Sequence, residues 1–390
     1  AESTLIGGDA RVPAMQAAFA NAISSHSIEL DDIDVLALFH FSPPVYSSAL
    51  ATAEQVGASG KDLLTALAAG CEMMERLSKA ANSSLRNRGF HTTPTTGVFG
   101  ATIAAAKLQG LSEEQIVSAL GMAGASASGL MEMYGPSMQK RFNPGPAARN
   151  GVTAATMAGL GFTGAATIFE GERGFDNLYE PLDRVRTLGG LGQSYLLQTL
   201  TLKNYPSCFC NHAAIVATER LVAQHNLSVD QLSECTVRLT PYMNRLVGAQ
   251  FSIGDSPQVA AQFSVQYSIA SILLRGSFRL QDIDTDAVLD PAVMECIKKI
   301  KIEIDQTESG KFTPATVIIQ TKAGERYSCT IDEIPGTPAS PLDDEQVRTK
   351  AMICFTSGPF ALTDAQARKL IARIDAIDEF NNMQEFWNLV

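Results

Sequence analysis

The stretch Gly89-Phe90-His91-Thr92-Thr93-Pro94-Thr95-Thr96-Gly97-Val98-Phe99-Gly100 runs directly into Ala101-Thr102-Ile103-Ala104-Ala105-Ala106-Lys107-Leu108. A glycine-flanked histidine, a run of hydroxyls and a proline are typical of a loop that opens a helix, and the residues that follow are small and apolar. Small side chains let two helices approach closely. The stretch therefore predicts a tightly packed domain of many helices that are rich in alanine and glycine.

Small and apolar residues recur at helical spacing on both sides of this stretch. They predict helices over residues 13–25, 45–56, 62–80, 113–124 and 147–160. Three segments have the form of a capping box, with a Ser or Thr three residues before a Gln, which marks the start of a helix: 112–115, 228–231 and 363–366. Residues 1–198 are therefore predicted to be mostly helical.

The character of the sequence changes after Gly189-Gly190-Leu191-Gly192. Strand-like segments follow at 235–240, 299–304, 316–320 and 326–331, the last two forming a hairpin around Lys322-Ala323-Gly324-Glu325. Helices are expected among them at 213–224 and 263–274. The proline-rich stretch 335–341 ends this part, and helical character returns from residue 343.

We therefore predict a mainly α fold. A large multi-helix domain is built from both chain ends, residues 1–198 and 341–390, and a smaller α+β lid domain of residues 199–340 is inserted in it. A pocket between two such domains is the default position for a site.

Composition narrows the class of protein. The 390 residues are 45% hydrophobic with a mean hydropathy of +0.05, which is typical of a packed globular chain. No apolar run approaches the roughly 20 residues of a membrane span, so no membrane partner is expected. The net charge is −11 and the 30 Lys and Arg form no basic block, so no nucleic-acid partner is expected either. An acidic protein that binds an acidic substrate must gather its few cations in one pocket.

Cysteines and the missing motifs exclude several kinds of site. The seven cysteines are odd in number and lack a framework spacing, which indicates free thiols in a reducing compartment. Cys208-Phe209-Cys210-Asn211-His212 has no second cluster to complete a metal site, so no metal is expected. The motifs for nucleotides, acyl-serine chemistry and zinc proteases are missing, so we expect no cofactor. No signal peptide is visible. We expect a cytoplasmic protein, or a mitochondrial one if a targeting segment precedes the sequence.

Two loops carry candidate chemistry. His91 precedes a predicted helix start, where anions are favoured, so it is a candidate proton carrier beside a carboxylate or phosphate; the alternative is a histidine that caps the loop. Lys140 and Arg141 lie in the irregular segment Tyr134-Gly135-Pro136-Ser137-Met138-Gln139-Lys140-Arg141-Phe142-Asn143-Pro144-Gly145-Pro146. Paired cations at a helix start suit carboxylate recognition, and a solvated surface loop is the alternative.

Other candidates are less specific. The acidic segment Glu29-Leu30-Asp31-Asp32, close to His40, would bind a metal, orient a histidine, or cap a helix as solvated charge. Lys203 and His212 lie where the second domain begins, hence near the domain interface. Tyr242 follows a predicted strand, where ordinary packing is the alternative to a role at the site.

The order of these motifs resembles the MmgE/PrpD family, and the resemblance runs from near residue 5 to the C-terminus. The matching motifs are Glu-Leu-Asp-Asp … His, Gly-Phe-His … Gly-x-Phe-Gly-Ala, Lys-Arg-Phe-Asn-Pro-Gly-x-Ala-Ala-Arg-Asn-Gly, Gly-Phe-Thr-Gly and Lys-Asn-Tyr-Pro-Ser-Cys … His. Members usually begin with a helical segment upstream of the part that corresponds to Ala1, so we expect a missing or cleaved N-terminal segment. Many members also carry Thr or His where this chain has Ile33 and Asp34.

The resemblance implies a helical domain with a smaller α+β lid, usually as a homodimer, and a site in the cleft. It implies that His91 is the acid/base, with Lys140, His40 and His212 around the substrate carboxylates, and that Tyr242 reaches in from the lid. The family's activities include dehydration of 2-methylcitrate, decarboxylation of cis-aconitate and epimerisation of iminodisuccinate, all without a cofactor.

We therefore predict a cofactor-independent lyase or isomerase that acts on a small di- or tricarboxylate by proton transfer next to a carboxylate. Lys140, Arg141 and Lys203 are the candidates to stabilise the negative charge of the transition state, and Arg141, Lys203 and Glu29 are the predicted substrate-binding residues. A 2-methylcitrate-dehydratase-like lyase is the first choice, a cis-aconitate decarboxylase the second and an epimerase the third. A non-catalytic relative that binds a carboxylate is the alternative from another class.

Overall fold

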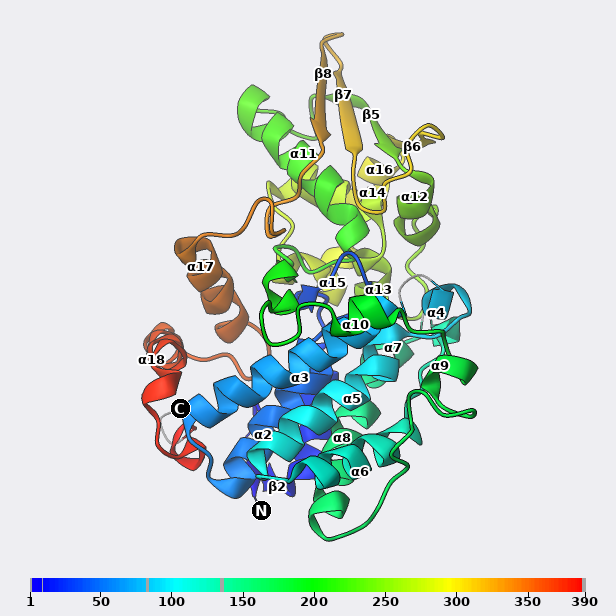
Figure 1. The fold of residues 1–390 in the computed structure, drawn as a ribbon. Helices are drawn as coiled ribbons and strands as arrows, with labels where there is room; N and C mark the ends of the chain where they lie inside the picture. The colour runs from blue at the N-terminus through cyan, green and yellow to red at the C-terminus, as the bar shows by residue number, and fades with distance from the viewer. Residues whose placement is uncertain (1, 9, 82–83, 134–136, 388–390) are drawn as a thin grey trace.

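The computed structural model describes residues 2–8, 10–81, 84–133 and 137–387, and the fold is mainly helical, as the sequence predicts (Figure 1). The helices before residue 200 are α1 (Ala14–Ser25), α2 (Ser47–Val56), α3 (Gly60–Ala80), α4 (Ser84–Asn87), α5 (Thr92–Leu108), α6 (Glu113–Gly124), α7 (Gln139–Phe142), α8 (Pro144–Gly159), α9 (Phe175–Leu178) and α10 (Arg184–Leu188). The later helices are α11 (Phe209–His225), α12 (Pro241–Val247), α13 (Pro257–Gln262), α14 (Val265–Arg275), α15 (Thr285–Val288), α16 (Pro291–Ile297), α17 (Asp344–Phe355) and α18 (Asp364–Asp375).

The helices of the first half pack closely because glycine and alanine lie where they meet. Helix α5 contacts both α3 and α8. A Cβ added to Gly70 of α3 would lie 2.7 Å from the carbonyl oxygen of Gly100 in α5, and one on Gly151 of α8 would lie 2.5 Å from the Cβ of Ala101. Neither position has room for a side chain, so the predicted close packing of small-residue helices is confirmed.

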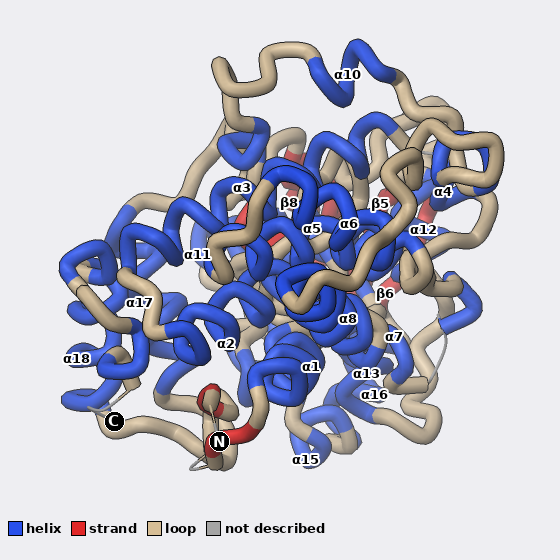
Figure 2. The backbone as a smooth tube through the Cα atoms, turned by 60° about the horizontal axis from the view of Figure 1, so that its bottom comes forward, coloured by secondary structure: helices blue, strands red, loops and turns tan. Residues whose placement is uncertain are grey.

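Strands are few and short, as Figure 2 shows. One sheet in the second half has the order β6-β5-β7-β8, with β5 (Leu232–Leu239) parallel to β6 (Ile300–Ile304) and antiparallel to β7 (Ala315–Thr321), which forms a hairpin with β8 (Arg326–Ile331). Two-stranded pairs join β1 (Ser3–Thr4) to β2 (Arg11–Val12) and β3 (Asp32–Ile33) to β4 (Thr201–Leu202). The second pair ties the acidic segment of the first half to the start of the second.

Helix α11 packs on β7 and β8 and, with α14, belongs to one large apolar core of the second half. The C-terminal residues Leu370, Met383 and Phe386 pack instead in a cluster with Phe41 and Val45 of the first half. Both chain ends therefore contribute to the same helical core. The domain boundaries near residues 198 and 340 stay predictions.

One predicted helix start is wrong. The side chain of Gln231 accepts a hydrogen bond from the amide of Ser228, as in a capping box, but no helix follows, since β5 begins at Leu232. The strand pairs with β7 on one side and β6 on the other, so sheet formation overrides the local capping signal. The boxes at Ser112 and Thr363 do begin α6 and α18.

Among the residues that the structure describes, no helix combines the length and apolar character needed to cross a bilayer.

Candidate active site

Most of the side chains that the sequence singles out meet in one small cavity between the two halves of the chain. Its lining residues are Glu29, Ile33, Leu38, His40, Arg86, His91, Lys140, Lys203, Cys208, Phe209, Tyr242, Leu246, Phe263 and Phe312. The cavity volume is about 40 Å³, well below the roughly 300–1,000 Å³ of pockets that hold a small ligand. A bound carboxylate would therefore require the walls to move apart.

His91 lies at the start of α5, as predicted, and its backbone is held by the neighbouring segment. Its amide donates to the carbonyl of Gly129 at 2.9 Å, and its side chain makes no capping hydrogen bond, so the capping alternative is wrong. Asn143 Nδ2 donates to His91 Nδ1 at 3.2 Å, which leaves Nε2 to carry the proton of the neutral ring. Burial, followed by the electrostatic effect of the neighbouring His26 and Lys140, keeps the pKa of His91 well below its usual value.

Asp31 connects two further histidines. Its Oδ2 lies 2.7 Å from His26 Nδ1 and 3.1 Å from His40 Nδ1, and the same nitrogen of His40 lies 2.5 Å from the carbonyl oxygen of Asp32. His40 Nδ1 therefore donates, which fixes its tautomer. The His26 and His40 rings meet edge to face with centroids 4.7 Å apart, and the His26 ring lies 6.4 Å from that of His91. The acidic segment thus orients histidines and is not a solvated cap.

Glu29 is the centre of the buried cations. Its Oε1 accepts from Lys140 Nζ and lies 3.2 Å from Arg141 Nη1, and its Oε2 lies 2.8 Å from Lys203 Nζ. Lys203 also reaches Asp31 Oδ1 at 3.1 Å. These side chains are nearly fully buried, so the alternative of a solvated surface loop for Lys140 and Arg141 is wrong.

The charges of this cluster support one another. Burial opposes ionisation of Glu29, but Lys140, Lys203 and Arg141 outweigh it and hold the pKa of that carboxyl well below its usual range. Burial also opposes the charge of Lys203, and the carboxylates of Asp31 and Glu29 outweigh it, so the pKa of Lys203 is raised. The raised pKa of Lys203 favours its charged form, and ion pairs with Glu29 fix the positions of Lys140, Arg141 and Lys203, so these groups are already positioned for an incoming anion.

Two predicted residues lie outside the lining of the cavity. Arg141 stands behind Glu29, where its Nη2 donates to Gln262 Oε1. His212 is fully buried, with its ring 5.2 Å from that of Tyr205 and 4.7 Å from that of Phe209. A role for His212 at a substrate carboxylate stays a prediction. The part of the segment 134–146 that comprises residues 134–136 lies outside the described residues.

Sequence reasoning missed several residues of the site. Asp31 belongs to the predicted acidic segment 29–32 and His26 precedes it by five residues, but neither is among the predicted site residues. Arg86 lines the cavity but carries no local pattern that marks it, and Cys208 also lines it, although its motif predicts no role for it at the site. Arg86 adds a third cation to Lys140 and Lys203 on the lining.

A metal ion has one candidate position among the described residues, the group His26, Asp31 and His40. Their atoms lie at hydrogen-bonding distances, and His40 Nδ1 donates to a carbonyl oxygen, so this nitrogen is not available as a ligand. Cys208, Cys210 and His212 do not form such a group within the described ranges.

We therefore expect turnover to survive exhaustive chelation, because proton transfer by a histidine needs no metal here. The check is an activity assay after dialysis against a chelator, with metal analysis of the dialysed protein. Loss of activity that one specific metal restores would contradict the expectation.

Comparisons with known proteins match most of the chain to one family. The model of the MmgE/PrpD N-terminal domain matches residues 1–187, and that of the MmgE/PrpD C-terminal domain matches residues 205–376. Cis-aconitate decarboxylase of Homo sapiens is 28% identical over 360 residues, covering 88% of this chain and 73% of the relative. The cis-aconitate decarboxylase-like protein oryM of Aspergillus oryzae is 28% identical, covering 89% and 77%. Cis-aconitate decarboxylase of Aspergillus terreus is 24% identical, covering 98% and 83%.

Proposed function

The chain belongs to the MmgE/PrpD family, and from this premise we propose that it is a cofactor-independent lyase that releases CO₂ from a small tricarboxylate of the cis-aconitate type. One observation carries the proposal: a buried histidine, His91, shares a small cavity with the cationic side chains of Arg86, Lys140 and Lys203. Relatives that are named cis-aconitate decarboxylases support the choice of reaction. The family match supports a lyase in general, and the release of CO₂ is the finer proposal.

The residues suit the charge changes of such a reaction. When a carboxymethyl group attached to a carbon–carbon double bond loses CO₂, the electron pair of the broken bond spreads through the double bond. It then resides on a carbon next to a retained carboxylate, where a proton must be added. Lys140 and Lys203 stabilise the negative charge that builds up on that carboxylate, and His91 supplies the proton.

The substrate itself prepares His91 for this role. In the empty cavity burial holds the pKa of His91 low, so the ring is neutral near pH 7. Bound carboxylates bring negative charge close to the ring and favour its protonated form. Substrate binding would therefore take up the proton that the reaction then delivers to carbon.

Dehydration of a 2-methylcitrate-like substrate is the second candidate. Loss of water from the same kind of carbanion needs a group that protonates the departing hydroxyl, and His40 lies on the cavity with its ring oriented by Asp31. The homodimer and the movement of residues 199–340 as a lid remain parts of the proposal.

The reaction is tested by proton NMR with four substrates: cis-aconitate, citrate, 2-methylcitrate and iminodisuccinate. We expect cis-aconitate to be converted with release of CO₂, while the others change slowly or not at all. Conversion of 2-methylcitrate with loss of water would favour the dehydratase instead. Thermal stabilisation by these anions without any turnover would contradict both candidates and indicate a carboxylate-binding relative.

A further inference from the structure

A second, larger cavity adjoins the active-site cavity. Its volume is about 530 Å³, within the range of pockets that hold a small ligand, and its described lining comes from Met133, residues 137–141 and residues 245–264. The two cavities share three lining residues, Lys140, Leu246 and Phe263. These three side chains therefore lie between the larger outer cavity and the small inner one.

The outer cavity has a charge unlike that of the whole protein. Its charged lining residues are Lys140, Arg141 and Arg245, and its described lining includes no Asp or Glu, in a chain of net charge −11. Arg245 is exposed, whereas Lys140 and Arg141 are buried. Positive charge therefore continues from the surface inward to the active-site cations. Such a lining raises the local concentration of anions.

Two of the three side chains between the cavities, Phe263 and Leu246, are only partly buried. Phe263 is half-buried, and its ring centroid lies 5.4 Å from Lys140 Nζ and 5.7 Å from Arg141 Cζ. Leu246 is also half-buried. Turning one aromatic and one aliphatic side chain would join the two spaces, and no strand or long helix would have to break.

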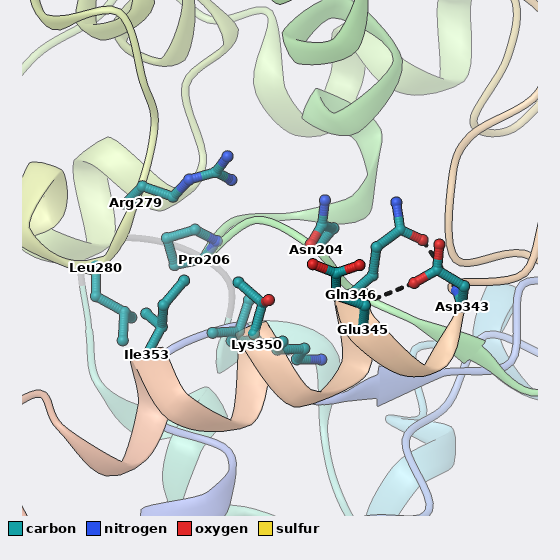
Figure 3. Close-up of a pocket in the computed structure, with 11 residues that line it drawn as sticks. Asn204, Pro206, Arg279, Leu280, Asp343, Glu345, Gln346, Lys350 and Ile353 are labelled. Atoms are coloured by element: carbon teal, nitrogen blue, oxygen red, sulfur yellow. Dashed lines mark hydrogen bonds between the residues drawn. The ribbon is translucent and has the colours of Figure 1, made fainter. Parts of the chain in front are cut away.

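Another cavity offers a contrast. It measures about 400 Å³ and lies beside α17, with Arg279 across the space from Asp343 and Glu345 (Figure 3). Lys350 adds a second cation, so its charges are mixed. It shares no lining residue with the active-site cavity. Unlike the outer cavity, it therefore neither adjoins the active-site cavity nor has charged lining residues of a single sign.

We propose that the outer cavity is the entrance and staging site for the anionic substrate, with Arg245 as the residue that attracts a carboxylate and Phe263 and Leu246 as the gate to the active site. The proposal rests on the proposed function only for the identity of the substrate, because the route would serve any small carboxylate that reaches the inner cavity.

Cys208 allows a test that needs no turnover. It is half-buried, lines the inner cavity and is a free thiol. A hydrogen bond from the Cys210 thiol lowers the pKa of Cys208 to about 7, so a useful fraction is the reactive thiolate at neutral pH. Iodoacetate is an anionic alkylating reagent and iodoacetamide is its neutral counterpart. The rate of Cys208 alkylation by each, measured by peptide mass spectrometry, reports passage into the cavity.

We expect Arg245→Glu to slow alkylation by iodoacetate about tenfold at low salt and to leave the iodoacetamide rate nearly unchanged. The difference should shrink at high salt, and Arg245→Gln should give an intermediate effect. Arg326→Glu is the matched control, because Arg326 is an exposed arginine at the start of β8, away from both cavities, and should have no effect. Phe263→Ala should speed alkylation by both reagents.

Equal iodoacetate rates in Arg245→Glu and Arg326→Glu would overturn the proposal, and a slower rate in Arg279→Glu instead would assign the route to the cavity beside α17. This result is separable from the proposed function. If none of the four carboxylates is turned over, the lyase proposal fails even when the alkylation pattern holds; if turnover is normal and the pattern is absent, only the entrance fails.

Discussion

His91→Gln is expected to lower kcat by about 10²–10⁴-fold, the usual contribution of a general acid or base, while the protein stays folded. Glutamine approximates the size of histidine and can accept the hydrogen bond that Asn143 donates, but it cannot deliver a proton. The measurement is kcat on the substrate identified by NMR, together with a thermal melt. His225→Gln is the matched control, since His225 stacks on Tyr327 with ring centroids 3.8 Å apart and does not line the cavity.

The same role for His91 predicts the direction in which activity changes with pH. Burial, then the neighbours beginning with His26 and Lys140, keeps the pKa of His91 in the free protein well below its usual value. The reaction needs the protonated form, whose fraction falls tenfold for each pH unit above that pKa. We therefore expect kcat/KM of the wild type to fall as pH rises from about 6 to 8. A rise over this range, or wild-type turnover by His91→Gln, would assign the proton to another group.

Lys203→Met is expected to destabilise the protein by about 3–5 kcal/mol, because it leaves the buried carboxylates of Glu29 and Asp31 without their shared cation. Lys203 is 1% exposed, so water cannot replace the lost charge. Urea-induced unfolding at neutral pH measures the change. Lys322→Met is the control, since Lys322 lies exposed in the turn of the β7–β8 hairpin.

The loss should depend on pH in a defined direction. Cations hold the pKa of Glu29 and of Asp31 well below the usual range, so both carboxyls are charged at neutral pH in the wild type. Without Lys203 they take up protons more readily, and the difference between variant and wild type should shrink as pH falls toward 5. A difference below about 1 kcal/mol at neutral pH, comparable to an exposed ion pair, would mean that the cluster does not hold the fold together.

The sequence was most informative where a feature repeats along one element. The spacing of small residues predicted α5 and its neighbours. These helices touch at Gly70, Gly100 and Gly151, where there is no room for a larger side chain. Strand alternation predicted the hairpin of β7 and β8 with small errors at the ends. At 228–231 the local signal failed because pairing with distant strands decided the structure.

The site was predictable only in part, because it depends on side chains brought together from distant segments. Loop composition and the family resemblance pointed to Glu29, His91 and Lys140, and these residues do meet. Arg86 gave no signal, since a single arginine on a short helix becomes a site residue only through tertiary packing. His212 was named with Lys203, but α11 carries it one turn beyond the cavity, between the rings of Tyr205 and Phe209.

The most direct test of the central claim is conversion of cis-aconitate in D₂O, followed by proton NMR, by the wild type and by His91→Gln. We predict that the wild-type product has lost CO₂ and carries one deuterium on the carbon next to a retained carboxylate. This deuterated carbon should have a single configuration. We also predict that His91→Gln forms this product at least about 100-fold more slowly. Unchanged cis-aconitate with the wild type, or equal rates of labelled product from both proteins, would contradict the central claim.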